Sequence, residues 1–82
     1  MDIYFIYAYG CEKCEEMEAL LITLKKPRTK IVRMECETED AIDYAVDNNI
    51  NDLPACNIGG IIIQGEDFDT DEIKAAIKKM NL

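Results

Sequence analysis

The chain has 82 residues, enough for one small domain, of which 49% are hydrophobic and 32% are charged. This balance is typical of a folded globular protein and argues against disorder. Seventeen Asp and Glu against nine Lys and Arg give a net charge of −8, which disfavours nucleic-acid binding because phosphates are bound by Lys and Arg. The sequence contains no histidine, which excludes imidazole bases, haem ligation by histidine and Cys2His2 zinc sites.

The cellular setting follows from what the chain lacks. No apolar run approaches the roughly 20 residues of a membrane helix, so we expect no membrane association. The run at residues 3–8 is too short for a secretory signal and has no basic residue before it. We therefore expect a cytoplasmic, monomeric protein in a reducing compartment. There, four cysteines are better suited to a catalytic pair than to a disulfide framework.

The first half of the chain predicts a strand, a helix and a second strand. Ile3–Ala8 is a continuous β-branched and aromatic run, typical of a strand covered on both faces. A helix should follow Cys11-Glu12-Lys13-Cys14 and end before Pro27, with Lys25-Lys26 matching its dipole. The apolar face of this helix consists of Met17, Leu20, Leu21 and Leu24. Residues Lys30–Cys36 alternate between apolar and charged side chains and predict the second strand.

The next segment predicts a helix and a hairpin. Thr38 is suited to cap a helix that fades at Asn48-Asn49. One face of this helix carries Ile42, Ala45 and Val46. Leu53-Pro54 opens a short third strand, Ala55–Ile58, and Gly59-Gly60 turns the chain into a fourth strand at residues 61–63.

An acidic loop after Gly65 leads to the last helix. Asp69 is placed to cap this helix, with Glu72 completing a capping box. Its apolar face consists of Ile73, Ala76, Ile77 and Met80. The predicted order is therefore β-α-β-α-β-β-α in one α/β domain, residues 1–82. The first two strands should be parallel, the hairpin antiparallel, and helices should cover both faces of a mixed four-stranded sheet.

The dithiol Cys11/Cys14 lies at the junction of the first strand and the first helix. There, Cys11 is close to unpaired helix N–H groups and the positive end of the helix dipole, which favour a thiolate. Lys13 favours it too, whereas Glu12 opposes it. Cys14 lies about one turn further on and is placed to attack a mixed disulfide formed at Cys11. Cys11 is thus the predicted nucleophile and Cys14 the predicted resolving thiol.

The element order, the dithiol after the first strand and Pro54 before the third strand resemble the minimal thioredoxin fold, and its glutaredoxin branch in particular. The resemblance covers nearly the whole chain. It implies that Leu53-Pro54 is a cis-proline site packed beside the dithiol, with the Leu53 backbone free to pair with substrate. It also implies a substrate groove, and Tyr9 and Lys13 are candidates to line it. Tyr9 is equally suited to pack on the first helix.

The Gly-Gly turn and Gly65-Glu66-Asp67 are similar to the part of glutaredoxins that binds the γ-glutamyl amine of glutathione. Asp67 matches the first acidic position of that motif, while Phe68 stands at the second. Glu12-Lys13 replaces the usual proline and aromatic residue between the cysteines, and residues 7–9 contain no lysine for a glutathione carboxylate. The resemblance therefore predicts the fold and the dithiol, and leaves the dependence on glutathione open. The acids from Asp69 onward are equally explained as the start of a helix.

Cys36 and Cys56 are expected to be small buried hydrophobic residues rather than half of a four-cysteine metal site. Because Cys56 lies two residues after Pro54, a regulatory disulfide near the active site also remains open.

The main functional hypothesis is a thiol–disulfide oxidoreductase that reduces protein disulfides, with ribonucleotide reductase as one substrate that the resemblance implies. It would need no bound metal or cofactor, and would receive electrons from glutathione or a reductase of the thioredoxin-reductase type. Two alternatives remain. One is a metal-binding or metal-carrier module that uses Cys11 and Cys14. The other is a non-catalytic adaptor whose acidic face binds a partner.

Overall fold

The structure is a computed structural model that describes residues 2–82. Within that range the elements follow the predicted order. They are β1 (Asp2–Tyr7), α1 (Glu12–Leu24), β2 (Lys30–Glu35), α2 (Glu39–Asp47), β3 (Ala55–Ile58), β4 (Ile61–Gln64) and α3 (Thr70–Met80). The four strands form one mixed sheet in the order β2-β1-β3-β4. The predicted fold class is confirmed.

The strand register brings four chain segments to one end of the sheet. β1 pairs in parallel with β2 and antiparallel with β3, and β3 pairs antiparallel with β4. Beyond the strands, the Cys36 N–H donates to the Tyr7 carbonyl at 2.8 Å, and the Gly65 N–H donates to the Pro54 carbonyl at 2.9 Å. The ends of β1, β2 and β4 and the start of β3 therefore meet at the same edge, which we call the dithiol edge because Cys11 follows β1 there.

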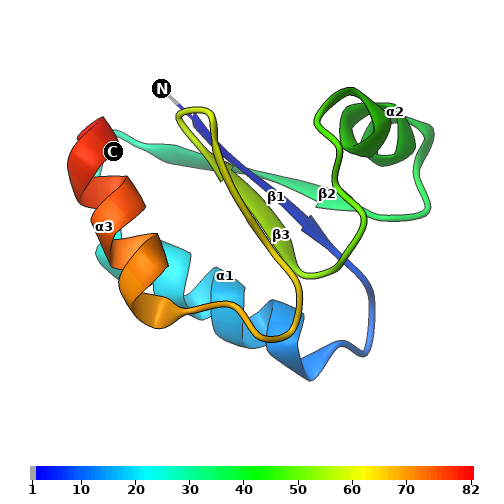
Figure 1. Cartoon of the computed structure of the whole chain (residues 1–82), viewed down its shortest axis with the longest axis horizontal. Helices are drawn as coiled ribbons and strands as arrows, with labels where there is room; N and C mark the ends of the chain where they lie inside the picture. The colour runs from blue at the N-terminus through cyan, green and yellow to red at the C-terminus, as the bar shows by residue number, and fades with distance from the viewer. Residues whose placement is uncertain (1) are drawn as a thin grey trace.

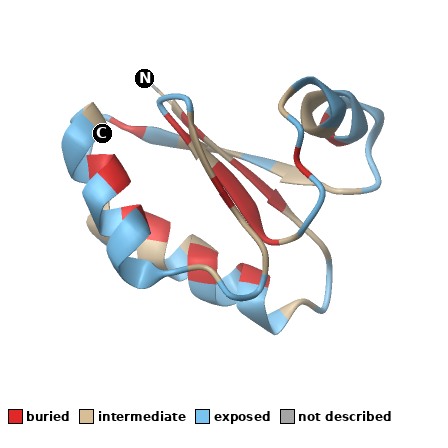
Figure 2. Cartoon of the chain, in the orientation of Figure 1, coloured by how far each residue is buried: buried red, intermediate tan, exposed pale blue. Residues whose placement is uncertain are grey.

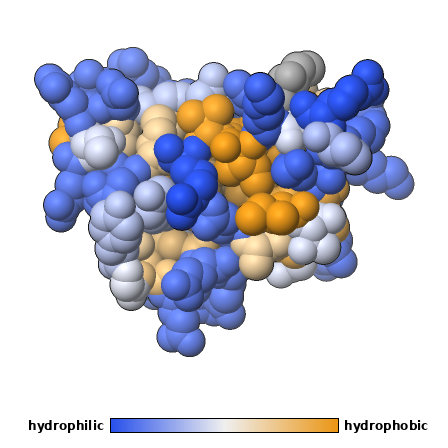
Figure 3. All heavy atoms as spheres, turned by 180° about the vertical axis from the view of Figure 1, so that it is seen from behind, coloured by the Kyte–Doolittle hydropathy of each residue, from blue (hydrophilic) through white to orange (hydrophobic). Residues whose placement is uncertain are grey.

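Helices cover both faces of the sheet (Figure 1), with α1 and α3 on one face and α2 on the other. The larger core cluster lies under α1 and α3, and the smaller cluster lies under α2. Figure 2 shows the buried positions of α1 and α3 turned toward the sheet. The rear of the molecule has apolar side chains gathered near its middle with hydrophilic ones around them (Figure 3).

Of the apolar face predicted for α2, Ala45 packs against the core cluster under the helix, whereas Ile42 and Val46 are exposed. Ile42 is 51% exposed and Val46 is 72% exposed, whereas Ala41 is buried. The orientation of α2 is set by Tyr44, whose ring stacks on Tyr4 with centroids 5.0 Å apart. The hydroxyl of Tyr44 also accepts a hydrogen bond from the Asn57 side chain at 2.8 Å. These contacts turn Ile42 and Val46 toward solvent.

The helix caps follow the sequence with one difference. Thr38 caps α2, because its Oγ1 accepts the Ala41 N–H at 3.2 Å. Asp69 caps α3, and its carboxylate accepts the Asp71 N–H at 2.8 Å. Among residues 2–82 the return bond from Glu72 is absent, so α3 has the predicted cap without the capping box.

Adjacent positions of α1 should differ strongly in their effect on stability. Leu21 is fully buried, whereas Ile22 is 56% exposed. We expect Leu21→Ala to lower the free energy of unfolding by about 2–5 kcal/mol, because it leaves a cavity in the core. The matched variant Ile22→Ala should change it by no more than about 0.5 kcal/mol. Urea denaturation of both variants measures the difference, and similar losses would contradict the packing of α1.

Candidate active site

The dithiol forms the start of α1. Cys11 is the N-cap residue, and its Sγ accepts a hydrogen bond from the Cys14 N–H at 3.1 Å. The two cysteines are joined as a disulfide, with their Cα atoms 5.2 Å apart. Cys11 is half-buried, whereas Cys14 is 2% exposed. One sulfur is therefore accessible to a partner and the other lies behind it.

A tight turn places Cys11 at this cap. β1 ends at Tyr7, and the chain reverses through Tyr9 and Gly10 before α1 begins. Gly10 has a φ of +71°, a left-handed conformation that glycine adopts without the steric cost of a side chain. The Cys14 N–H faces the Cys11 sulfur, and the partial positive charge of the helix start stabilises an anion there.

Lys13 is engaged within its own helix. Its ammonium group forms a salt bridge with Glu16 at 3.1 Å, and both side chains are about half exposed. Glu16, by hydrogen bonding and by charge, raises the pKa of Lys13, and the charges of Glu12 and Glu66 act in the same direction. The nearest cation in sequence to Cys11 is thus largely compensated by acids, so the helix N–H groups provide the main positive field at Cys11.

Tyr9 lies beside the dithiol. It is 81% exposed, and its ring meets the Tyr7 ring edge-on with centroids 5.7 Å apart. Both tyrosines border a cavity of about 110 Å³ that Cys11 and Cys14 also line. Tyr9 thus contacts Tyr7 at the end of β1, and the two roles that the sequence leaves open for it, lining a substrate groove or packing on α1, stay predictions.

Arg33 borders the same cavity and was not among the predicted site residues. Its guanidinium lies 4.6 Å from the centroid of the Tyr7 ring, a cation–π contact, and forms an ion pair with Glu18 of α1. Glu18 follows Cys14 by one helical turn and also lines the cavity. The sequence could have indicated this position of Arg33 only through the register of the two parallel strands, which places Arg33 opposite Phe5.

Leu53 and Pro54 lie at the dithiol edge. The bond between them is cis, and Pro54 is fully buried. Leu53 is half-buried and packs against both core clusters, including the one that Cys11 also contacts. Among residues 2–82 no backbone–backbone hydrogen bond of the turns and loops involves Leu53.

The loop after β4 approaches the outer side of α1. Gly65, with a φ of +100°, starts the loop, and Asp67 is exposed. A shallow pocket of about 220 Å³ is lined by Lys13 from α1 and by Glu66 and Phe68 from the loop. Phe68 packs against the larger core cluster. Lys13 and Glu66 thus line one pocket, whereas the predicted residues Gly65 and Asp67 are not among its lining residues.

The two remaining cysteines are separate from the dithiol pair. Cys56 is buried in the larger core cluster, and burial raises the pKa of its thiol to about 12. Cys36 is half-buried at the end of β2, and burial together with the charge of Glu35 raises its pKa. Within residues 2–82 no three His, Cys, Asp or Glu side chains come together as a possible metal site. The four cysteines do not converge on one centre.

The fold and the dithiol define a thioredoxin-like domain with a Cys-x-x-Cys disulfide at the start of its first helix. Solved structures with the same fold include thioredoxin O2 from Arabidopsis thaliana in the oxidized state, with a TM-score of 0.68 and 13% sequence identity over 95% of this chain and 72% of that one. Thioredoxin 1 from Thermosipho africanus matches with a TM-score of 0.63 and 14% identity over 96% and 92% of the two chains. A malarial protein matches with a TM-score of 0.57 and 16% identity over 99% and 97%.

Sequence comparison adds no closer relative. No protein-family model and no curated protein sequence matches the chain. At the identities above, the structural matches show the fold alone. None of the helices in residues 2–82 has the length and apolar character needed to cross a membrane.

The cysteines should differ in reactivity after mild reduction. At about pH 8 we expect iodoacetamide to modify Cys11 first and Cys36 more slowly, because only the thiolate reacts and the pKa of Cys36 is raised. Cys56 should remain unmodified until the protein unfolds, since its pKa is about 12 and it is buried. Peptide mapping by mass spectrometry gives the order. Labelling of Cys56 as fast as Cys36 in the folded protein would contradict it.

Proposed function

We propose that this protein is a thiol–disulfide oxidoreductase that reduces disulfides in other proteins through Cys11 and Cys14. The observation that supports this function best is the pairing of a half-buried Cys11 at a helix N-cap with a buried Cys14 within disulfide distance. The helix start favours the Cys11 thiolate, and burial protects Cys14 from external disulfides until a mixed disulfide has formed.

The reaction proceeds in two exchanges. The Cys11 thiolate attacks one sulfur of the substrate disulfide, forming a mixed disulfide and releasing the other substrate sulfur as a thiolate. Cys14 then loses its proton and attacks the Cys11 sulfur. This step releases the second substrate thiolate, and protons from solvent complete the two substrate thiols. The substrate gains two electrons, and the enzyme is left with the Cys11–Cys14 disulfide.

Two electrons must then return to the enzyme, from two molecules of a monothiol or from one dithiol. The donor we propose is glutathione or a reductase of the thioredoxin-reductase type. Asp67, exposed on the loop after Gly65, would bind the amine of a glutathione-like ligand. The backbone groups of Leu53 would pair with an extended substrate segment across Pro54, and Tyr9 would border that segment. We further propose a cytoplasmic monomer with no bound cofactor or metal, and ribonucleotide reductase as a possible class of substrate.

The first test is a redox titration. We expect the protein, equilibrated in graded glutathione buffers and then alkylated, to close the Cys11–Cys14 bond reversibly at one defined potential. Cys11→Ser should abolish reduction of a disulfide substrate such as insulin. Cys14→Ser should instead accumulate a mixed disulfide with substrate, because the resolving thiol is missing.

Cys36→Ser is the matched control and should leave turnover of a small disulfide such as bis(2-hydroxyethyl) disulfide unchanged, since Cys36 is outside the dithiol pair. Retention of full activity by Cys11→Ser would disprove the assigned roles. A dithiol that never closes at any potential would disprove the oxidoreductase function itself.

A further inference from the structure

The charges of this chain are divided sharply between two parts of the sequence. Residues 34–73 contain twelve Asp and Glu and no Lys or Arg, so every basic residue lies outside this segment. The segment includes all of α2 and the loop from α2 to Pro54. An acidic surface alone is explained by solubility, but five of these acids belong to α2 and the loop after it, which also line an apolar groove. They are Glu39, Asp40, Asp43, Asp47 and Asp52.

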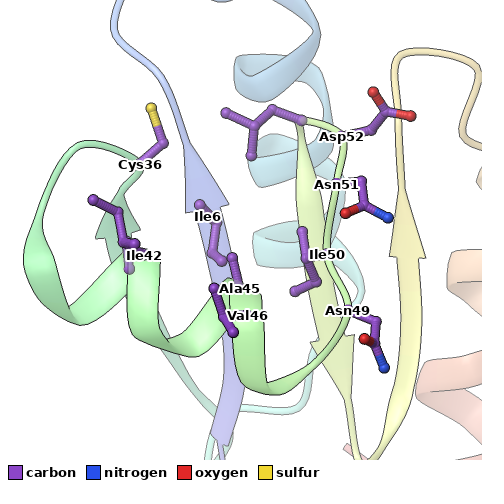
Figure 4. Close-up of a pocket in the computed structure, with 11 residues that line it drawn as sticks. Ile6, Cys36, Ile42, Ala45, Val46, Asn49, Ile50, Asn51 and Asp52 are labelled. Atoms are coloured by element: carbon purple, nitrogen blue, oxygen red, sulfur yellow. The ribbon is translucent and has the colours of Figure 1, made fainter.

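The groove (Figure 4) lies between α2, β1 and the loop at residues 49–53. Its volume is about 480 Å³. Ile6 of β1 forms its floor, and Ile42 and Val46 of α2 line it although they are 51% and 72% exposed. In Figure 4 the polar ends of Asn49, Asn51 and Asp52 point away from Ile6. The lining is thus mainly apolar, and Asn49, Asn51 and Asp52 add polar groups to it.

Exposed apolar side chains gathered over a groove mark a binding surface more often than isolated ones do. α2 buries Ala41 and half-buries Tyr44 against the sheet, so Ile42 and Val46 do not serve the core. The remaining exposed positions of α2 are acidic, namely Glu39, Asp40, Asp43 and Asp47. A partner that fits this surface must offer apolar side chains to the groove and positive charges to its border.

The groove is continuous with the dithiol edge through Leu53. This residue lines the groove, packs against both core clusters, and directly precedes Pro54. Cys36, also at the dithiol edge, lines the same end of the groove. An extended chain that pairs with the Leu53 backbone near Cys11 would therefore reach the groove with its neighbouring residues.

We infer that the groove between α2 and β1 binds a basic segment with apolar side chains in the disulfide-bearing substrate protein, next to the cysteine that reacts with Cys11. The inference rests on the proposed function and adds the class of substrate. Apolar contacts with Ile42 and Val46 provide affinity, and the acidic border speeds the encounter with basic segments and rejects acidic ones.

Three short synthetic peptides test this. Each holds one cysteine as a mixed disulfide with 2-nitro-5-thiobenzoate, whose release is coloured. The first flanks the cysteine with leucines and lysines, the second has glutamate for each lysine, and the third has serine for each leucine. We expect kcat/KM with the first peptide to exceed that with either other peptide by about tenfold at low salt, and the advantage over the glutamate peptide to fall as salt is raised.

The variant Ile42→Gln/Val46→Gln should lose the preference for leucine, with about a tenfold lower kcat/KM for the first peptide. Both side chains are exposed, so the fold should be retained. Ile22→Gln, an exposed position of α1 outside the groove, is the matched control and should behave as the unaltered protein. Turnover of bis(2-hydroxyethyl) disulfide, which is too small to fill the groove, should be the same in all three proteins.

Equal rates with the three peptides, or an unchanged preference in the double variant, would overturn the docking surface while turnover of the small disulfide leaves the proposed function standing. A second measurement tests whether the groove binds the peptide even if the proposed function is wrong. Fluorescence anisotropy with a labelled first peptide, its cysteine replaced by serine, reports binding without chemistry. Groove-dependent binding without turnover of any disulfide would support the docking surface and disprove the oxidoreductase function.

Discussion

The central strand β1 is the constraint on which the functional end of this protein depends. It pairs with β2 on one side and β3 on the other, so its position is fixed by hydrogen bonds along both edges. Successive residues of a strand point to opposite faces. Tyr7 therefore borders the cavity beside the dithiol, and Ile6 forms the floor of the groove under α2. One strand end thus determines the geometry of both sites.

The electrostatics of the dithiol come from the backbone more than from side chains. The first turns of α1 carry Glu12, Glu15 and Glu16, which stabilise the helix start but disfavour an anion beside it. Lys13 is paired with Glu16, and exposed charges are screened by salt. The Cys14 N–H donates directly to the Cys11 sulfur at short range, and this contact is little affected by screening. The thiolate at Cys11 is therefore favoured locally within an acidic surface.

The sequence is sufficient for much of this architecture, and the exceptions have a common cause. Element order, the Asp69 cap and the dithiol at the start of α1 follow from local patterns, and each is present in the structure. The orientation of α2 does not follow from local patterns, because it depends on contacts of Tyr44 with Tyr4 and Asn57, which are distant in sequence. The cation–π contact between Arg33 and the Tyr7 ring likewise depends on the register of β1 and β2. Periodicity identifies an apolar face but not the partner it meets.

The orientation of α2 also links stability with binding. A helix with two apolar faces can pack either one against a sheet, and in this protein the face with Ala41 and Tyr44 packs against it. Complete burial of a large aliphatic side chain contributes about 1.5–3 kcal/mol. Ile42 and Val46, which are 51% and 72% exposed, forgo part of this contribution in a small domain. Local conflicts of this kind concentrate at functional sites, where a partner supplies the missing burial. Because Leu53 joins the groove to the dithiol edge, binding at Ile42 and Val46 would also hold a substrate disulfide near Cys11.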